Sequence, residues 1–267
     1  MGIVTPLGRI DKRGWKESRQ VAISFDKDSG VAMTRLGNTR ILCSIEAQIG
    51  APRKASRPGS GSIQFFMDIL PMAHPSGTET LDTQTEECLT MLETLFRETY
   101  CIDFDTLCIE MNEYVFDLKC SLKVLDYDGG LFDCSTLAVT SALMGFKRND
   151  VTYNGITKRL IQHPASEKPM VPLTMIYKPA TVTFGFIDGI EDPIVDPTEA
   201  ESVCIRGYLV VGANHRGEIC LMYQSGQLCL TPEMIVKCSA FAISQAKPIV
   251  DKMGLAVYGK VEDVIMR

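Results

Sequence analysis

The sequence predicts an α/β fold of mixed strands and helices, arranged as two pseudo-symmetric halves. Three observations predict it. The 267 residues are 45% hydrophobic and 22% charged, which is typical of a globular chain with a sizeable core. Runs of alternating or dense apolar residues are bounded by glycine and proline, as strands are, and each series of runs is followed by an amphipathic helix. The pattern occurs over about residues 8–148 and again over 149–254, so we expect one domain that spans 1–267.

The first half opens with a predicted hairpin. Val21, Ile23 and Phe25 alternate with polar or small residues, and a polar turn at 26–30 leads into a second strand at 31–36. A denser apolar strand is expected over 39–49, and another over 63–70. Proline residues then interrupt the pattern, which predicts a break before the first helix.

That first helix is predicted from a capping signal, Thr83 with Glu86, followed by apolar residues at helical spacing to about residue 100. Two strands are expected next, over 107–111 and 114–125. The turn Asp128-Gly129-Gly130 then opens a second helix, predicted over about 134–144.

The second half repeats the pattern more loosely. Strands are predicted near 171–177, 180–187, 205–213 and 217–224. The last helix has Thr231 as its expected N-cap and Pro232 in its first turn, and Gly254 is its expected stop.

Charge is distributed unevenly along the chain. The net charge is −6, yet residues 1–60 hold eleven Lys or Arg against five Asp or Glu. Three of these cations, Arg53, Lys54 and Arg57, lie in a proline- and glycine-rich segment that we expect to be a surface loop, either solvated or in contact with phosphate. The ten cysteines form no C-x-x-C pair, and neither a signal peptide nor an 18-residue apolar run is visible, so we expect an intracellular protein.

Two segments could carry chemistry. Gly129 and Gly130 ahead of a helix could cradle a phosphate, but Leu131 and Phe132 follow them and favour a tight turn into the core. The acidic stretch at 188–201 could bind Mg²⁺ or supply an acid and a base, although its glycine and prolines favour a solvated loop. No P-loop, G-x-S-x-G or H-E-x-x-H pattern occurs, so residue chemistry alone indicates no enzyme.

Several segments resemble the RNase PH family in order and spacing. They are Gly8-Arg9-Ile10-Asp11-Lys12-Arg13, Leu36-Gly37-Asn38-Thr39-Arg40, Ile69-Leu70-Pro71-Met72-Ala73-His74-Pro75 and Val124-Leu125-Asp126-Tyr127-Asp128-Gly129-Gly130. The likeness extends over about residues 8–253. It implies the RNase PH-like fold (ribosomal protein S5 domain 2-like), and within that family it is strongest toward the ring subunits of RNA exosomes.

The same resemblance implies that catalysis is absent. Active members of the family place a threonine and an arginine after the double glycine, where this sequence has Leu131 and Phe132. They place a catalytic aspartate where this sequence has Arg206. We therefore expect no enzyme, no catalytic residue, no metal and no cofactor. Two alternatives stay open, an active phosphate-dependent 3′–5′ exoribonuclease and a metal-dependent enzyme built on the acidic loop.

The resemblance also implies partners. These are other RNase PH-like exosome ring subunits, S1/KH cap subunits, a hydrolytic nuclease of the RNase II/R type and single-stranded RNA, with no membrane, in nucleus, nucleolus and cytoplasm. Relatives carry arginines on the first helix, of which Arg97 remains here. Arg97 is the expected RNA contact inside the channel, with Arg53, Lys54 and Arg57 near its mouth. Arg97 could equally be a surface residue paired with Glu93.

Overall fold

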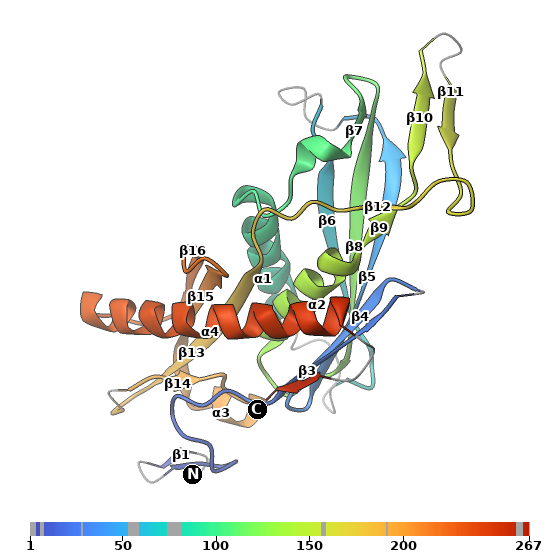
Figure 1. The fold of residues 1–267 in the computed structure, drawn as a ribbon. Helices are drawn as coiled ribbons and strands as arrows, with labels where there is room; N and C mark the ends of the chain where they lie inside the picture. The colour runs from blue at the N-terminus through green and yellow to red at the C-terminus, as the bar shows by residue number, and fades with distance from the viewer. Residues whose placement is uncertain are drawn as a thin grey trace.

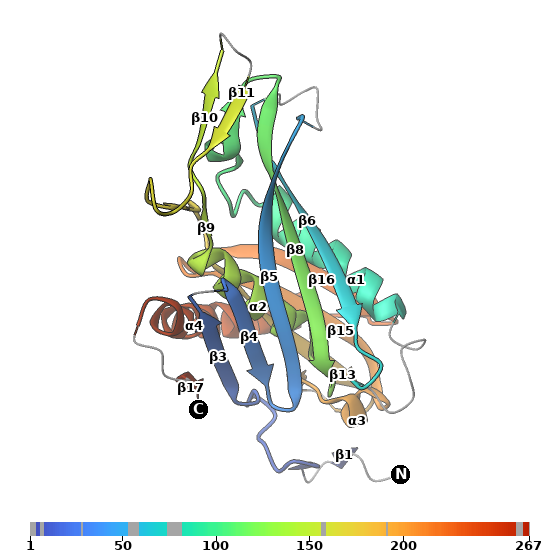
Figure 2. The same cartoon turned by 90° about the vertical axis from the view of Figure 1, so that its right-hand side faces the viewer.

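The computed structural model describes residues 4–5, 8–27, 29–52, 59–73, 82–155, 159–190, 192–259 and 264–266. Two sheets and the helices between them form the body of the molecule (Figures 1 and 2). A short two-stranded ladder, β1 (Val4–Thr5) with β2 (Gly8–Arg9), lies near the N-terminus. No helix in the described part of the chain combines the length and apolar character needed to cross a bilayer.

The larger sheet is formed by strands of the first half together with the C-terminal edge strand β17, in the order β17-β3-β4-β5-β8-β6, with β7 on β8. Its strands are β3 (Val21–Asp26), β4 (Val31–Leu36), β5 (Thr39–Gly50), β6 (Ser62–Ile69), β7 (Cys108–Glu110), β8 (Tyr114–Asp126) and β17 (Val264–Met266). All neighbours are antiparallel except β6 and β8, which run parallel. The strands predicted over the first half are thereby confirmed.

Alternation along these strands decides which face is buried. Val21, Ile23 and Phe25 point into the core, while Ala22 and Ser24 between them are half-buried. Successive side chains of a strand point to opposite faces, so one face of the sheet packs on helices and the other stays open. Figure 2 looks onto that open face.

Three helical segments fill the space behind the larger sheet. They are α1 (Asp82–Glu93), the π-helical turn η2 (Thr94–Glu98) that continues it, and α2 (Leu131–Gly145). Every residue of α2 from Leu131 to Met144 is buried, because this helix packs on β4 and β5 of one sheet and on β13 of the other. Because α2 is buried on every side and contacts both sheets, it is the element that joins the two halves.

The smaller sheet belongs to the second half and has the order β14-β13-β15-β16, all antiparallel. Its strands are β13 (Pro179–Ile187), β14 (Ile194–Val195), β15 (Ile205–Asn214) and β16 (Ile219–Gly226). The long helix α4 (Pro232–Tyr258) packs on β13 and β15 and reaches α2 (Figure 1). A one-turn helix, α3 (Glu199–Ser202), follows β14.

Three of the predictions are wrong in detail. The segment 171–177 contains only the two-residue strand β12 (Val171–Pro172), which pairs with β9 (Lys147–Arg148). Gly254 does not stop α4, which runs on to Tyr258 because Gly254 keeps helical geometry. Thr83 lies inside α1, after Asp82, and so is not its N-cap.

A hairpin that the sequence reading missed stands away from the body. Its strands are β10 (Val151–Asn154) and β11 (Arg159–Gln162), which pair antiparallel at the end of the molecule opposite the termini (Figures 1 and 2). Four-residue strands with mixed polarity carry little periodicity, so the pattern gave no signal. A 3₁₀ turn at Phe104–Leu107, η3, was missed for the same reason.

Candidate functional site

A cavity of about 280 Å³ opens beside the Gly129-Gly130 turn; we call it the double-glycine cavity. Its walls come from α1, from the turn and the first residues of α2, from the segment around α3, and from β15 and β16. The lining residues are Gln84, Glu87, Cys88, Met91, Tyr127, Gly129, Gly130, Leu131, Phe132, Thr183, Pro197, Thr198, Ser202, Tyr208, Val210, Tyr223 and Ser225. Both halves of the chain therefore contribute to one site.

Glycine is required at both positions of the turn. Gly129 and Gly130 have φ values of 76° and 67°, in the left-handed region that favours glycine. A Cβ on Gly129 would lie 2.7 Å from the carbonyl oxygen of Pro197. The turn can approach the second half this closely only because it lacks side chains.

The two residues after the turn are buried. Leu131 and Phe132 are 7% and 5% exposed and belong to the main core, as their apolar character predicts. Phosphate binding calls for charge-assisted donors such as arginine. Among the described residues that line the double-glycine cavity, none is a lysine or an arginine.

A buried ion pair, Arg19 with Asp196, holds the Gly129-Gly130 turn in place. The Arg19 guanidinium donates to both carboxylate oxygens of Asp196, from Nε at 2.9 Å and from Nη2 at 2.6 Å. The same guanidinium donates to the carbonyl oxygens of Asp128 and Gly129. A bidentate, charge-assisted pair of this kind fixes geometry as well as energy. Arg19 therefore ties the turn of the first half to the acidic segment of the second.

The acidic stretch is only partly the solvated loop that its composition favoured. Glu201 is fully buried and accepts hydrogen bonds from Nε and Nη2 of Arg9 at 2.8 and 2.6 Å, while Asp196 is 2% exposed. These contacts, together with the backbone N–H of Thr198, hold the pKa of Glu201 below its usual value, against the opposing effect of burial. Two carboxylates of the stretch are thus structural anchors, which composition could not show because their arginine partners lie about 180 residues away.

Asp133 is a buried carboxyl group without a cationic partner. Its Oδ2 accepts the backbone N–H of Thr183 at 2.9 Å, and Oδ1 has no hydrogen-bond partner among the described residues. Burial, and secondarily the nearby charge of Asp196, raise its pKa to about 6. Burial also raises the pKa values of Tyr127 and Tyr208 in the cavity, so both phenols stay protonated.

Arg97 is the one residue among those expected to contact RNA that the structure describes, and it does not line this cavity. Arg97 is half-buried in η2 and forms no ion pair with Glu93, so the surface-pair reading lacks its contact. Arg53, Lys54 and Arg57 lie outside the described residues. Arg206, exposed on β15, is bonded through Nη1 to Oδ1 of Asp188 at 2.8 Å. No three His, Cys, Asp or Glu side chains of the described chain come together as a metal site.

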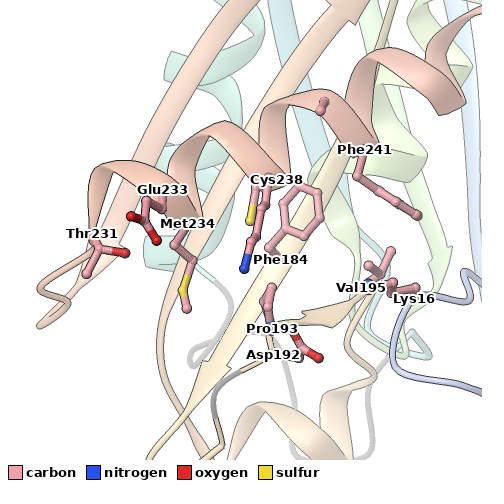
Figure 3. Close-up of a pocket in the computed structure, with 12 residues that line it drawn as sticks. Lys16, Phe184, Asp192, Pro193, Val195, Thr231, Glu233, Met234, Cys238 and Phe241 are labelled. Atoms are coloured by element: carbon pink, nitrogen blue, oxygen red, sulfur yellow. The ribbon is translucent and has the colours of Figure 1, made fainter.

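A second cavity of about 560 Å³ lies between the first turns of α4 and the β13–β14 edge (Figure 3). Its floor is apolar, with Phe184, Val195, Met234 and Phe241 facing one another across it. Charged residues of both signs line its margin. Asp192 of the acidic stretch is among the residues that line it, and Arg97 is not.

The most informative site residues were missed by pattern reasoning. Arg19 and Asp196 are far apart in sequence, and the three tyrosines of the cavity come from three different elements. Periodicity reports only local structure, so it could not bring them together. Composition had singled out the acidic stretch that contains Asp196, but it gave no indication of the pairing with Arg19.

Family models match both halves of the chain. The model described as "3' exoribonuclease family, domain 1" matches residues 17–149, and domain 2 of the same family matches residues 178–245. Two solved structures share the fold. A chain of the Archaeoglobus fulgidus exosome with RNA bound to the active site is 26% identical, with a TM-score of 0.78 over 92% of each chain. An archaeal exosome core chain is 24% identical, with a TM-score of 0.76 over 92% of this chain and 91% of that one.

Curated relatives give the same result. The chain is 32% identical to exosome complex component RRP45 of Danio rerio over 93% of its own length and 63% of that protein's. It is 31% identical to exosome complex component RRP45A of Arabidopsis thaliana, over 89% and 78% of the two lengths. It is 30% identical to exosome complex component RRP45 of Saccharomyces cerevisiae, over 92% of its own length and 84% of that protein's. The resemblance and the RNase PH-like fold are confirmed, and the chain belongs to the 3′ exoribonuclease family, the RNase PH family.

Proposed function

We propose that this chain is a non-catalytic ring subunit of an RNA exosome, which scaffolds the ring and guides RNA through its channel for 3′-to-5′ processing and degradation. Relatives at about 30% identity over most of the chain are named exosome complex component RRP45, which supports the assembly. Similarity in sequence alone does not decide whether the site is active. The contents of the double-glycine cavity carry that part of the proposal.

The main observation behind the proposal is that the described lining of the cavity contains no cationic side chain to hold the phosphate that phosphorolysis requires. Attack by phosphate needs positive groups to hold the attacking anion and to stabilise the charge that develops on the transferred group. Instead, Leu131 and Phe132 follow the turn and are buried, and the described lining contains no lysine or arginine. Glu87 adds a negative charge to the wall, which would repel phosphate.

Arg206 supports the same conclusion. It stands on β15 where the resemblance places the catalytic aspartate of active members, so the charge there is reversed. Its guanidinium is bonded to Asp188 at the surface, and Arg206 does not line the double-glycine cavity. A cation bound elsewhere cannot replace a general acid or a ligand for a metal.

The proposed partners follow from a ring built of related subunits. They are other RNase PH-like ring subunits, S1/KH cap subunits, an RNase II/R-type nuclease that carries out hydrolysis, and single-stranded RNA. Arg97 on η2 is the proposed RNA contact, with Arg53, Lys54 and Arg57 as further candidates outside the described residues. We place the complex in nucleus, nucleolus and cytoplasm, which imaging of a tagged chain would check.

Native mass spectrometry of the tagged chain, purified from its own cells, tests the proposal. We expect a complex of many different subunits that includes RNase PH-like and S1-domain proteins. Incubation of the purified chain with RNA and inorganic phosphate should release no nucleoside diphosphates. A monomer or homo-oligomer would contradict the scaffold role, and phosphate-dependent release of diphosphates would establish an active exoribonuclease instead.

A further inference from the structure

The double-glycine cavity has a chemistry opposite to that of a phosphate site. Three phenols line it, from Tyr127, Tyr208 and Tyr223, together with the half-buried carboxylate of Glu87. Beside burial, the carboxylate of Glu199 contributes to raising the pKa of the Tyr127 phenol, whereas the nearby carboxylate of Asp128 is paired with Arg19 at 3.9 Å. Glu87 forms no ion pair with a described cation. The cavity therefore presents aromatic walls and negative charge to whatever enters it.

The size of the cavity limits what can enter. About 280 Å³ lies just below the roughly 300–1,000 Å³ of sites for drug-sized ligands, so it suits one long side chain better than a nucleotide. Gln84 at its margin is exposed, and Glu87, Tyr208 and Tyr223 are half-buried, so the cavity is open to the surface. A group delivered by a neighbouring molecule could reach it without rearrangement of the core.

Aromatic walls with a carboxylate select a cation. Tyrosine faces attract cations, and the attraction grows when the cation is removed from water. A guanidinium is favoured over an ammonium, because it is planar, stacks on aromatic rings and pairs with a carboxylate through two donors. RNA is disfavoured, because its phosphates would be brought near the carboxylates of Glu87 and Glu199.

We propose that the double-glycine cavity receives an arginine side chain of a neighbouring RNase PH-like ring subunit, so that a site without phosphate-binding residues serves as a contact between subunits. This inference rests on the proposed function, since a ring supplies the neighbour. The proposal is based on charge complementarity. The half-buried carboxylate of Glu87 lies in an aromatic cavity and has no cationic partner among the described residues, so an arginine from another subunit would pair with it.

Charge reversal within a reconstituted ring tests the contact. Glu87→Lys should weaken association with one RNase PH-like neighbour at least tenfold. Glu86→Lys makes the same charge change on the adjacent, exposed residue of α1 and should leave association within twofold of the unmodified chain. Equal effects of the two variants would overturn the proposal. Glu87→Gln, which keeps the shape of the side chain, should give an intermediate loss, and thermal unfolding would verify that each variant folds.

A titration of the isolated full-length chain separates this inference from the proposed function. N-acetyl-arginine amide should bind, as followed by NMR, and Glu87→Gln should weaken that binding at least fivefold, whereas Glu86→Gln should not. Uridine monophosphate should bind more weakly than the arginine probe. Tighter binding of the nucleotide, or no binding of the probe, would overturn the arginine site. Probe binding by a chain that joins no ring would uphold the site and reject the ring.

Discussion

The buried Arg19–Asp196 pair holds together segments from the two halves of the chain. Asp196 has a φ of 49°, which is uncommon for a residue other than glycine, and it is nevertheless buried. Its carboxylate accepts the backbone N–H of Arg19, two donors of the Arg19 guanidinium and a longer contact at 3.4 Å from Nη1 of Arg13. The contacts thus compensate for a strained backbone and for the removal of two charges from water.

Breaking this pair from one side should be strongly destabilising. Asp196→Ala removes the bidentate counter-charge of the buried Arg19 guanidinium and leaves it only the more distant carboxylate of Asp128 at 3.9 Å. We expect the free energy of unfolding to fall by about 3–5 kcal/mol in urea titrations. Asp188→Ala is the matched control, because it removes a carboxylate from an exposed arginine pair, and it should cost no more than about 1 kcal/mol. Similar losses for both variants would contradict the anchoring role of Asp196.

Asp133 predicts a pH dependence of opposite sign to that of a paired carboxylate. Its pKa is about 6 in the folded chain and about 3.9 in an unfolded one. Between these values the folded state binds more protons, so the Asp133 contribution to stability is present below pH 4 and is lost as pH rises through 6. The loss by pH 7 is roughly 3 kcal/mol.

Asp133→Asn isolates this contribution, because asparagine can still accept the Thr183 N–H and does not ionise. We expect the stability of Asp133→Asn relative to the unmodified chain to increase from pH 4 to pH 7, as measured by urea unfolding at each pH. Asp105→Asn, at an exposed carboxylate, should show no such trend. A flat difference for Asp133→Asn would mean that the folded-state pKa is not raised.

At the scale of elements, the entry into α2 requires glycine for two separate reasons, which a comparison with Gly30 distinguishes. Gly129 and Gly30 both have positive φ, 76° and 68°, but their surroundings differ. A Cβ on Gly129 would meet backbone atoms of Pro197, Thr198 and Glu199 within 3 Å, whereas a Cβ on Gly30 would meet nothing within 4 Å. Position 30 requires glycine only because its φ is positive. Position 129 requires glycine because its φ is positive and because a Cβ would clash with the backbone of residues 197–199.

This difference predicts that replacing glycine by alanine lowers the free energy of unfolding by different amounts at positions 30 and 129. Gly30→Ala should lower the free energy of unfolding by about 1 kcal/mol, the cost of a left-handed residue with a Cβ. Gly129→Ala should cost about 3 kcal/mol or more, because the backbone of the 197–199 segment must also move. Denaturant titration of both variants measures the contrast. Equal costs would show that the close approach of the two segments contributes nothing.

The elements predicted well from sequence are those whose own periodicity is strong. The β3–β4 hairpin alternates cleanly, and α4 has both its N-cap residue and its first-turn proline, so these elements appear where expected. Gly254 was wrongly predicted to end α4, because glycine frequently follows the last turn of a helix. A glycine with tertiary packing around it can stay helical. The segment 171–177 has apolar residues but no partner strand beyond two residues, and a strand needs a partner.

At the scale of the whole molecule, periodicity predicted the α/β class, and the family resemblance predicted the RNase PH-like fold. The apolar character of residues 131–132 predicted that they enter the core. The sequence could not predict the cavity, because Tyr127, Tyr208 and Tyr223 meet only when the two sheets pack around α2. The division into related halves near residue 148 stays a prediction. Burial of Glu201 was likewise out of reach, since it depends on Arg9 at the other end of the chain.

RNA guidance by Arg97 is a property of the assembled ring, and it is therefore tested there. Neutralising one phosphate contact should lower the slope of log binding constant against log salt by about 0.7 to 1, with little dependence on RNA sequence. We expect this for Arg97→Gln in a reconstituted ring, as measured by fluorescence anisotropy with single-stranded RNA from 50 to 200 mM salt. Arg159→Gln, on the exposed hairpin strand β11, removes the same charge far from η2 and should leave the slope unchanged. An unchanged slope for Arg97→Gln would remove Arg97 from the RNA path and direct attention to Arg53, Lys54 and Arg57.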